Sequence, residues 1–308
     1  MRLSNNSNST ALGKPLPDLC ASTFPLPSLH PVLRSVSENL HSGYGFTLIR
    51  GIPVDQYSRE ECVIIYVGIS SHIGSIFGRQ DGRFEGQPAD VMMAHITDFR
   101  DSKDDQRFTL AAYTDSEVIF HTDVGDIVSL FALGEPATGG ESQIASGWRV
   151  YNELARSRPD LIHTLADNWL IPRYVYSILR GNLQADVGLF VRLNSAKSDT
   201  MVQRPLLFYQ PAQDNNPERV IIQFSRRSFS GFGSLPQSKF LNESQAEALD
   251  ALHFLAKKFH ISMKLKKGDM QFINNLSTLH ARNSYIDDAE HRWAMHACQE
   301  KSGSVDVD

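Results

Sequence analysis

The run SEVIFHTDVGDIVSLF, residues 116–131, places a histidine and a carboxylate two positions apart inside an apolar segment. Residues i and i+2 of a β-strand project from the same face, so His121 and Asp123 would point together. An imidazole nitrogen and a carboxylate oxygen are ligands suited to a divalent iron ion. An H-x-D pair also fits a surface histidine beside a turn aspartate, so a metal site would need a third ligand.

The candidate third ligand is a histidine nearer the C-terminal end of the chain. His280 follows an apolar strand and the polar turn NNLST, which predicts an exposed position at the rim of a strand. A lone histidine is more often a satisfied core residue, but Arg292 follows it by twelve positions in the run HRWAMHA. An arginine in an apolar strand needs an anionic partner, and its planar fork matches a carboxylate.

In order and spacing these residues resemble the TauD/TfdA family of Fe(II)- and 2-oxoglutarate-dependent dioxygenases, from about GYGFTLIRG to HRWAMHA. The resemblance implies that His121, Asp123 and His280 form a two-histidine, one-carboxylate iron site. The segment TGGES, residues 138–142, matches a family motif whose hydroxyl residue helps to hold the cosubstrate, which gives that role to Ser142. Arg292 matches the family arginine that pairs with the far carboxylate of 2-oxoglutarate.

The resemblance also implies a fold and an activity. The fold would be α+β, with a double-stranded β-helix core (a cupin-like jelly roll) flanked by helices. The enzyme would use Fe(II), O2 and 2-oxoglutarate as cosubstrate, and would couple decarboxylation of 2-oxoglutarate to succinate and CO2 with hydroxylation, desaturation or cyclisation of a small molecule. Asp123 argues against the halogenase variant, which lacks that carboxylate. Family members often form dimers or tetramers, which makes a homo-oligomer an expectation here.

One position departs from the taurine-type pattern, in which a second arginine four residues after the first grips an anionic substrate group. This chain has His296 there. Four residues keep one face of a strand, so His296 is expected to face the same cavity as Arg292, as a poorer anion clamp than arginine. Further candidate substrate residues are Gln80, His95, Arg226, Arg227 and Asn275. For the adjacent arginines, only one of which can face the cavity, a surface ion pair is an equal alternative.

The elements that must position these residues follow from hydrophobic periodicity and capping signals. Helices are predicted at 28–43, 58–74, 146–168 and 243–260, and the second opens with Ser58 and Glu61 in a capping-box pattern. Strands are predicted at 44–51, 90–98, 127–134, 141–146, 204–210, 219–225 and 291–299, with a hairpin at 261–274. This order favours an α+β protein with a β-sandwich or barrel core, and no glycine-rich nucleotide loop is present.

Composition bounds the class of protein. The 308 residues are 41% hydrophobic and 21% charged, with a net charge of −5 and a pI near 6.1, which disfavours nucleic-acid or membrane partners. Three distant cysteines and no signal-peptide core predict a reducing, cytoplasmic location without disulfides. We expect a flexible segment at 1–28, one dioxygenase domain at 29–300 and a flexible tail at 301–308.

Two other functions fit parts of the pattern. One is a cupin-like iron enzyme that does not use 2-oxoglutarate, and the other is a non-catalytic binding protein on the same fold. Ser142 and Arg292 separate the first from the dioxygenase, because only a 2-oxoglutarate enzyme needs a carboxylate clamp. The presence of all three expected iron ligands disfavours the second.

Overall fold

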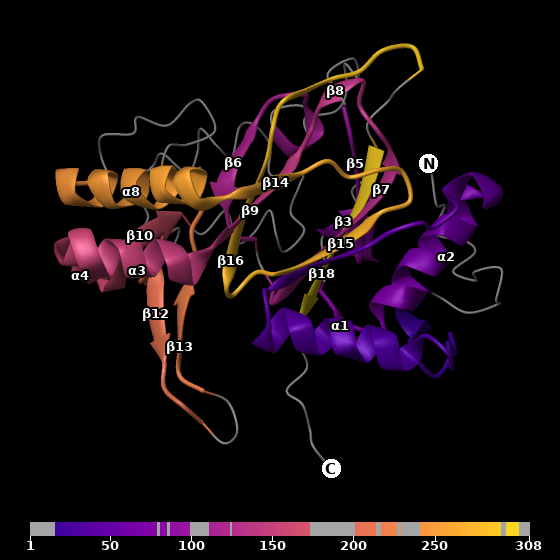
Figure 1. Cartoon of the computed structure of the whole chain (residues 1–308), viewed down its shortest axis with the longest axis horizontal. Helices are drawn as coiled ribbons and strands as arrows, with labels where there is room; N and C mark the ends of the chain where they lie inside the picture. Colours follow the sequence, from indigo (N-terminus) through magenta and orange to yellow (C-terminus); the bar gives the residue numbers. More distant parts are fainter. Residues whose placement is uncertain are drawn as a thin grey trace.

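Two antiparallel sheets form the centre of the structure, a computed structural model (Figure 1). It describes residues 16–78, 81–84, 87–98, 111–123, 125–172, 201–213, 217–226, 229, 241–290 and 294–301. Within these ranges, every strand pair is antiparallel. In the same ranges, no helix combines the length and the apolar character that crossing a membrane requires.

The larger sheet has six strands among the described residues. Its order is β1 (Phe46–Ile49), β15 (Met270–Asn274), β7 (Ile127–Gly134) and β18 (Ala294–Lys301), and both β2 (Ile76–Phe77) and β5 (Met93–Thr97) pair with β18. Its two faces pack differently. Phe131 and Phe272 lie in a core with α1 and α2, whereas Val128 and Ile273 lie in a cluster with Ile144 of the smaller sheet.

The smaller sheet carries the predicted metal ligands. Its order is β14 (Ile261–Met263), β9 (Ser142–Ser146), β16 (Thr278–Arg282) and β6 (Val118–His121). Ile144 faces the larger sheet, and its neighbour Ala145 packs outward with Leu279 against the helices. Further two-stranded pairs are β3 (Asp81–Phe84) with β4 (Gln87–Val91), β8 (Thr138–Gly139) with β17 (Tyr285–Ile286), β10 (Trp169–Pro172) with β11 (Met201–Arg204), and β12 (Leu207–Gln210) with β13 (Arg219–Ile222).

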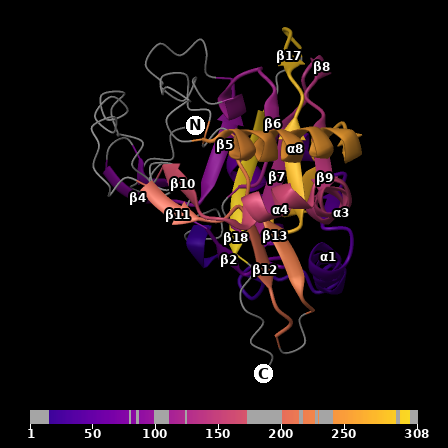
Figure 2. The same cartoon turned by 90° about the vertical axis from the view of Figure 1, so that its left-hand side faces the viewer.

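Helices cover the outer faces of both sheets. The helices are α1 (His30–Ser42), α2 (Arg59–Ser70), α3 (Gly147–Ser157), α4 (Pro159–Ala166) and α8 (Glu243–Phe259), with 3-10 turns η1 (Leu16–Asp18), η2 (Val54–Gln56) and η4 (Ala111–Tyr113). Figure 1 shows α3, α4 and α8 grouped on one side of the sheets and α1 and α2 on the other. Figure 2 shows α8 and α4 crossing in front of the strands. Both sheets are thereby shielded from water on their outer faces.

The capping signals predicted the helix boundaries well. The Ser58 and Glu61 capping box at the start of α2 is present in both directions, and Asn242 with Gln245 forms a second one at α8. The single helix predicted at 146–168 is wrong, because the chain breaks into α3 and α4 at Arg158. The residue before a proline avoids helical dihedrals, and Arg158 has φ −146° and ψ 65°.

Two other predictions about the elements are corrected by the structure. The hairpin predicted at 261–274 does not form, because β14 pairs with β9 in the smaller sheet and β15 pairs with β1 and β7 in the larger one. The segment predicted to be flexible up to residue 28 is packed from Leu16 onward. Leu19 is buried against Ile64 and Val67 of α2, which anchors this segment to the helix.

Candidate metal centre

Two histidines face each other across neighbouring strands of the smaller sheet. His121 ends β6, and His280 is its direct partner on β16, with ring centroids 4.2 Å apart. Directly opposed residues share a face of a sheet, and on the other side His280 pairs with Ile144, which lies between the two sheets. Both imidazoles therefore face the interior of the sandwich. His280 is 8% exposed and lies inside its strand, so the prediction of an exposed rim position is corrected.

Asp123 completes a group of three potential ligands. Its Oδ1 lies 3.4 Å from Nε2 of His121, and its Oδ2 lies 3.4 Å from Nε2 of His280. One potential ligand atom from each of the three residues lies within 4.8 Å of the others. Among the described residues, this is the group of histidine, cysteine and carboxylate side chains whose spacing could hold a metal ion. β6 ends at His121, so Asp123 lies in the turn that follows the strand. We had expected it to share a face with His121 through strand alternation.

The Nε2 atoms of both histidines lie beside Asp123, where they could bind a metal ion. The Nδ1 of His121 lies 2.8 Å from the carbonyl oxygen of Ile119, to which it donates its proton. This fixes the tautomer and leaves the Nε2 lone pair directed at Asp123, the arrangement that metal-binding histidines use. The Nδ1 of His280 is buried and has no hydrogen-bond partner among the described residues. Two imidazole nitrogens and a carboxylate facing one point need a cation there, which is a proton or a metal ion.

The electrostatics favour ligand forms of these residues. Burial alone would raise the pKa of Asp123, but the hydrogen bonds and charges that His121 and His280 provide when protonated outweigh it and hold that pKa far below its usual range. Burial, followed by the nearby His121, lowers the pKa of His280 against the opposing effect of Asp123. An ionised carboxylate and a neutral imidazole are the forms that bind a divalent metal.

The turn that carries Asp123 is held from two sides. On one side, Thr122 exchanges hydrogen bonds with Phe224: its N–H donates to the Phe224 carbonyl at 2.7 Å and its hydroxyl accepts from the Phe224 N–H at 2.9 Å. On the other side, the Asn275 side chain contacts the backbone of Asp123 and Gly125. Asn275 was expected to face the substrate, but its amide is directed at this turn instead.

One of the two predicted cosubstrate residues, Ser142, lies within the described residues. Ser142 pairs with Arg282, two residues beyond His280, so it lies on the same inward face of the sheet as the histidines. It is buried, and its hydroxyl donates to Oε1 of Gln271 across the sandwich at 2.9 Å. Arg292 lies outside the described residues.

Two substrate candidates, His95 and His296, lie in the larger sheet and not in the sheet that carries the metal ligands. His296 of β18 is the direct partner of His95 on β5 and of Phe131 on β7. Met93, two residues before His95, packs in the core with α1 and α2, so His95 lies on the helix-facing side of the sheet, not on the side toward the metal centre. That His296 shares a face with Arg292 stays a prediction, because Arg292 lies outside the described residues.

Of the remaining candidates, only Arg226 lies within the described residues, and it is not brought to the centre. Arg226 forms an ion pair with Asp250 of α8, which matches the surface-pair alternative. Gln80 and Arg227 lie outside the described residues. The position of Arg282 predicts that it braces a loop and does not contact 2-oxoglutarate, and its Nη2 donates to the carbonyls of Ala111, Thr114 and Ser116 at 3.0, 2.9 and 2.5 Å. Arg282 thereby braces the segment that leads into β6, and its position two residues after a ligand was the only signal for that role.

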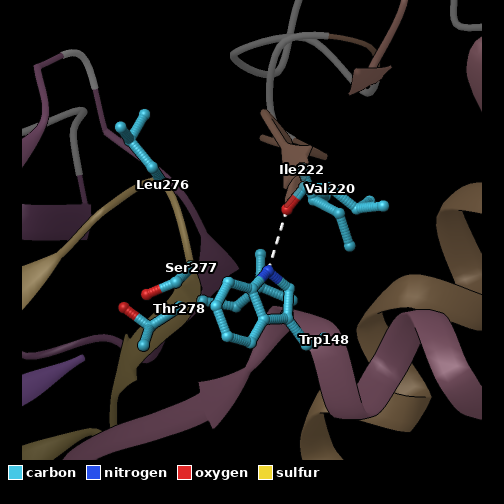
Figure 3. A pocket seen from close by; sticks show the side chains of 8 residues that line it. Trp148, Val220, Ile222, Leu276, Ser277 and Thr278 are labelled. Carbon is cyan, nitrogen blue, oxygen red and sulfur yellow. Dashed lines mark hydrogen bonds between the residues drawn. The ribbon is translucent and has the colours of Figure 1, made fainter. Parts of the chain in front are cut away.

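A shallow hollow lies elsewhere on the smaller sheet and lacks catalytic groups. Figure 3 shows its lining: Gly147, Trp148, Val220, Ile222, Leu276, Ser277, Thr278 and Leu279. The indole N–H of Trp148 donates to the carbonyl of Val220 at 2.9 Å across it. No titratable side chain lines this hollow, so the chemistry of the described chain is concentrated at the three-ligand group.

Comparison with protein families gives a match over nearly the whole chain. The profile of the family described as "Taurine catabolism dioxygenase TauD, TfdA family" matches residues 12–299. The chain is 32% identical over 277 residues to a taurine hydroxylase-like protein, SAT17, of Stachybotrys chartarum, covering 87% of this chain. The chain spans 63% of that relative's length. It is also 23% identical over 276 residues to FR-33289 synthase of Streptomyces rubellomurinus, covering 89% of this chain and 72% of that one.

Solved structures share the fold at low sequence identity. Asparagine oxygenase in complex with Fe(II), a 3-hydroxyasparagine and succinate is similar with a TM-score of 0.62 and 15% identity, over 91% of this chain and 82% of that one. The non-haem iron oxygenase OrfP, in complex with Fe and alpha-ketoglutaric acid, is similar with a TM-score of 0.58 and 18% identity, over 92% and 84%.

Proposed function

The chain belongs to the TauD/TfdA family of dioxygenases, and from this premise we propose that it is an Fe(II)- and 2-oxoglutarate-dependent dioxygenase that oxidises a C–H bond of a small molecule. The observation that carries the proposal is the inward-facing group of two histidines and one aspartate, with ligand atoms within 4.8 Å of one another. Two imidazoles and a carboxylate are the donor set of non-haem Fe(II) oxygenases.

The two sheets are, in this proposal, the halves of a double-stranded β-helix. Residues of both inner faces, among them Val128 and Ile144, form one cluster, as in a jelly roll. His280 is then buried in the roll, and the side chains of His121 and Asp123 are partly exposed, at 20% and 33%. The antiparallel pairing of β6, β9 and β16 supports this assignment, since it places His121, Ser142 and His280 on one face.

In this proposal, the residues of the chain bind and orient the metal ion and the cosubstrate. His121, Asp123 and His280 would hold Fe(II). Ser142 would help to hold 2-oxoglutarate, and Arg292, by family resemblance, would pair with its far carboxylate. When bound, the iron would supply an oxidant for C–H bonds, and 2-oxoglutarate and O2 would become succinate and CO2, with the second oxygen atom of O2 leaving in the product or as water.

The substrate is proposed to be a small molecule. Two of the structural neighbours are complexes with a hydroxylated asparagine and a hydroxylated arginine, which makes free amino acids the first class to screen. A taurine-like sulfonate is less favoured, because the position of the second family arginine holds His296.

The test begins with the cofactors and needs no substrate. The metal-free protein is titrated anaerobically with Fe(II) and then with 2-oxoglutarate while visible absorption is recorded. Chelation of the keto acid to protein-bound Fe(II) is expected to give a weak charge-transfer band that is absent in His121→Ala. Succinate release in the presence of individual amino acids then identifies the substrate.

Each failure of this test has a distinct meaning. If Fe(II) binds without a band on addition of 2-oxoglutarate, the proposal is wrong in favour of an iron enzyme that does not use this cosubstrate. If Fe(II) does not bind, the chain carries the fold of the family without its metal, and the assignment of an oxygenase activity fails.

A further inference from the structure

The side-chain amide of Asn275 is fully engaged by the turn that carries Asp123. Its Oδ1 accepts the N–H of Asp123 at 2.8 Å, and its Nδ2 donates to the carbonyls of Asp123 at 2.5 Å and of Gly125 at 2.8 Å. The backbone N–H of Asn275 adds a bond of 2.8 Å to the carbonyl of Asp126. Asn275 is 2% exposed, so these bonds form away from water.

These contacts fix the peptide groups on both sides of the Asp123 side chain. The N–H before it and the carbonyl after it are bound to one rigid amide, which restricts both backbone torsions of Asp123. Gly125 follows with φ +104°, a left-handed conformation that turns the chain back toward β7. With the backbone held, the carboxylate has only its own side-chain torsions left with which to move away from the imidazoles.

Asn275 also joins two of the three ligand-bearing elements. It lies in the turn between β15, which ends at Asn274, and β16, which carries His280 five residues later. The amide therefore links the strand of His280 directly to the turn of Asp123. A change in distance between these two ligands would have to break at least one of these buried hydrogen bonds.

We propose that Asn275 is a positioning residue for the metal centre, which holds Asp123 in its ligating position by clamping the turn 123–125. This inference rests on the proposed iron site. It predicts that loss of the amide weakens metal binding through Asp123, beyond any effect on folding. Residues that orient metal ligands contribute about 10- to 100-fold to metal affinity, which sets the expected size of the effect.

The neighbouring asparagine provides a matched control. Asn274 is equally buried, at 2% exposure, and its amide makes two hydrogen bonds. Its Nδ2 donates to the carbonyl of Leu40 on α1, and its Oδ1 accepts from the N–H of Leu276, each at 2.9 Å. Neither bond involves Asp123 or Gly125. Asn274→Ala therefore removes a buried, hydrogen-bonded amide from the neighbouring position, the last of β15, without releasing Asp123.

The experiment measures Co(II) affinity and thermal stability of the metal-free chain of 308 residues. Co(II) binding is followed by its visible ligand-field absorption, which also reports a change of ligand set. Both Asn274→Ala and Asn275→Ala are expected to lower the melting temperature. Only Asn275→Ala is expected to weaken Co(II) binding, by about 10- to 100-fold, and to alter the absorption spectrum. Anaerobic titration with Fe(II) should rank the affinities of the wild type, Asn274→Ala and Asn275→Ala in the same order.

A double-mutant cycle shows whether the effect passes through Asp123. In an Asp123→Ala background, at high Co(II) concentration, Asn275→Ala is expected to change affinity by no more than about twofold, because nothing is left to position. If alanine at 275 prevents folding, Asn275→Asp serves instead. It has nearly the same shape and keeps the accepting oxygen, but it loses both donated bonds and directs a carboxylate oxygen at the carbonyls of Asp123 and Gly125.

Three results would overturn the inference, and they are separable from failure of the proposed function. Asn275→Ala could bind Co(II) within about twofold of wild type, it could weaken binding no more than Asn274→Ala does, or it could weaken binding as strongly without Asp123. In each case Asn275 would be a structural residue of the turn. If the wild-type chain itself binds neither Co(II) nor Fe(II), the proposed function fails first.

Discussion

His121 lies directly opposite His280 on adjacent antiparallel strands, and the two rings face one carboxylate with 3.4 Å between each Nε2 and its nearest oxygen. The pairing register alone sets the two rings side by side, because opposed residues share a face. The third ligand arrives by a different route, from a turn held by Thr122 and Asn275. The centre therefore depends on both a strand register and a braced turn.

Removal of any one ligand should abolish strong metal binding. Asp123→Asn keeps the shape and removes the charge that balances the cation, and His280→Gln removes a buried nitrogen donor. We expect each variant to lose more than about 100-fold in Co(II) affinity, since even residues that only orient ligands contribute up to that much. Titration followed by absorption or calorimetry measures this loss. Unchanged affinity in either variant would mean that the metal binds elsewhere.

Metal affinity should fall with acidification through the imidazoles. A proton and a metal ion compete for each Nε2, so binding weakens as the pH drops below about 6.5, the ordinary histidine pKa. The lowered pKa of His280 means that this residue competes for protons only at still lower pH. Asp123, with a pKa far below its usual value of about 3.9, contributes no loss above about pH 4. Co(II) affinity measured between pH 5 and 8 tests this, and a flat profile would exclude the histidines as ligands.

The ligand residues could be found from sequence because they form a pattern of residue types at family spacing. The helix starts at Ser58 and Asn242 were similarly accessible, since capping depends on residues three apart. The capping signal is local in the sequence, and the ligand motif can be recognised without knowing the path of the chain between its members. Such features need no knowledge of how distant strands pair.

The errors concern features that only long-range pairing decides. β14 and β15 start nine residues apart, yet they join different sheets, because β14 pairs with β9 and β15 pairs with β7. The contact of Asn275 with Asp123 spans 152 positions, so an asparagine in a turn gave no signal of its partner.

Arg282 is expected to be a major contributor to stability near the centre. Its guanidinium is buried at 9% exposure, donates to three backbone carbonyls and lies 4.9 Å from the ring centre of Tyr285. Arg282→Met leaves those carbonyls without this donor, which should lower the free energy of unfolding by about 3 kcal/mol. Denaturant unfolding measures the change.

A second arginine gives the control for this prediction. Arg226 pairs with Asp250 on α8, where both side chains are at least one-third exposed, at 33% and 46%. Ion pairs of this kind contribute about 1 kcal/mol or less, so Arg226→Met should have a small effect. If Arg282→Met cost no more than Arg226→Met, the proposed bracing of residues 111–116 would be contradicted.

Cys20 should be a fast-reacting thiol. Hydrogen bonds with Ser22 and Thr23 lower its pKa to about 6, and it is exposed, whereas burial raises the pKa of Cys62. The thiolate is the nucleophile, so the rate of alkylation by iodoacetamide should rise to a plateau with a midpoint near pH 6. Cys20→Ser should remove this phase. A midpoint near the free-thiol value of about 8.5 would show that the Cys20 turn is not formed.

Ser142 is expected to affect the cosubstrate and not the metal. Its hydroxyl lies on the same inward face as His280 and donates to Gln271. A hydroxyl that turns to a carboxylate of 2-oxoglutarate forms a hydrogen bond to a charged group, and such a bond contributes about 1.5–3 kcal/mol. Ser142→Ala should therefore weaken 2-oxoglutarate binding about tenfold or more, while Co(II) affinity stays at the wild-type value.

The control lies on the same strand. Ser146 is exposed at the end of β9, where its hydroxyl caps α3 by accepting from the N–H of Arg149. Ser146→Ala should cost about 1 kcal/mol of stability with no change in 2-oxoglutarate affinity. Because Ser142→Ala also leaves the buried Gln271 oxygen without its donor, both variants lose stability, and only the cosubstrate titration separates them. Equal 2-oxoglutarate affinity in the two variants would remove Ser142 from the cosubstrate site and leave its hydroxyl as a structural link to Gln271.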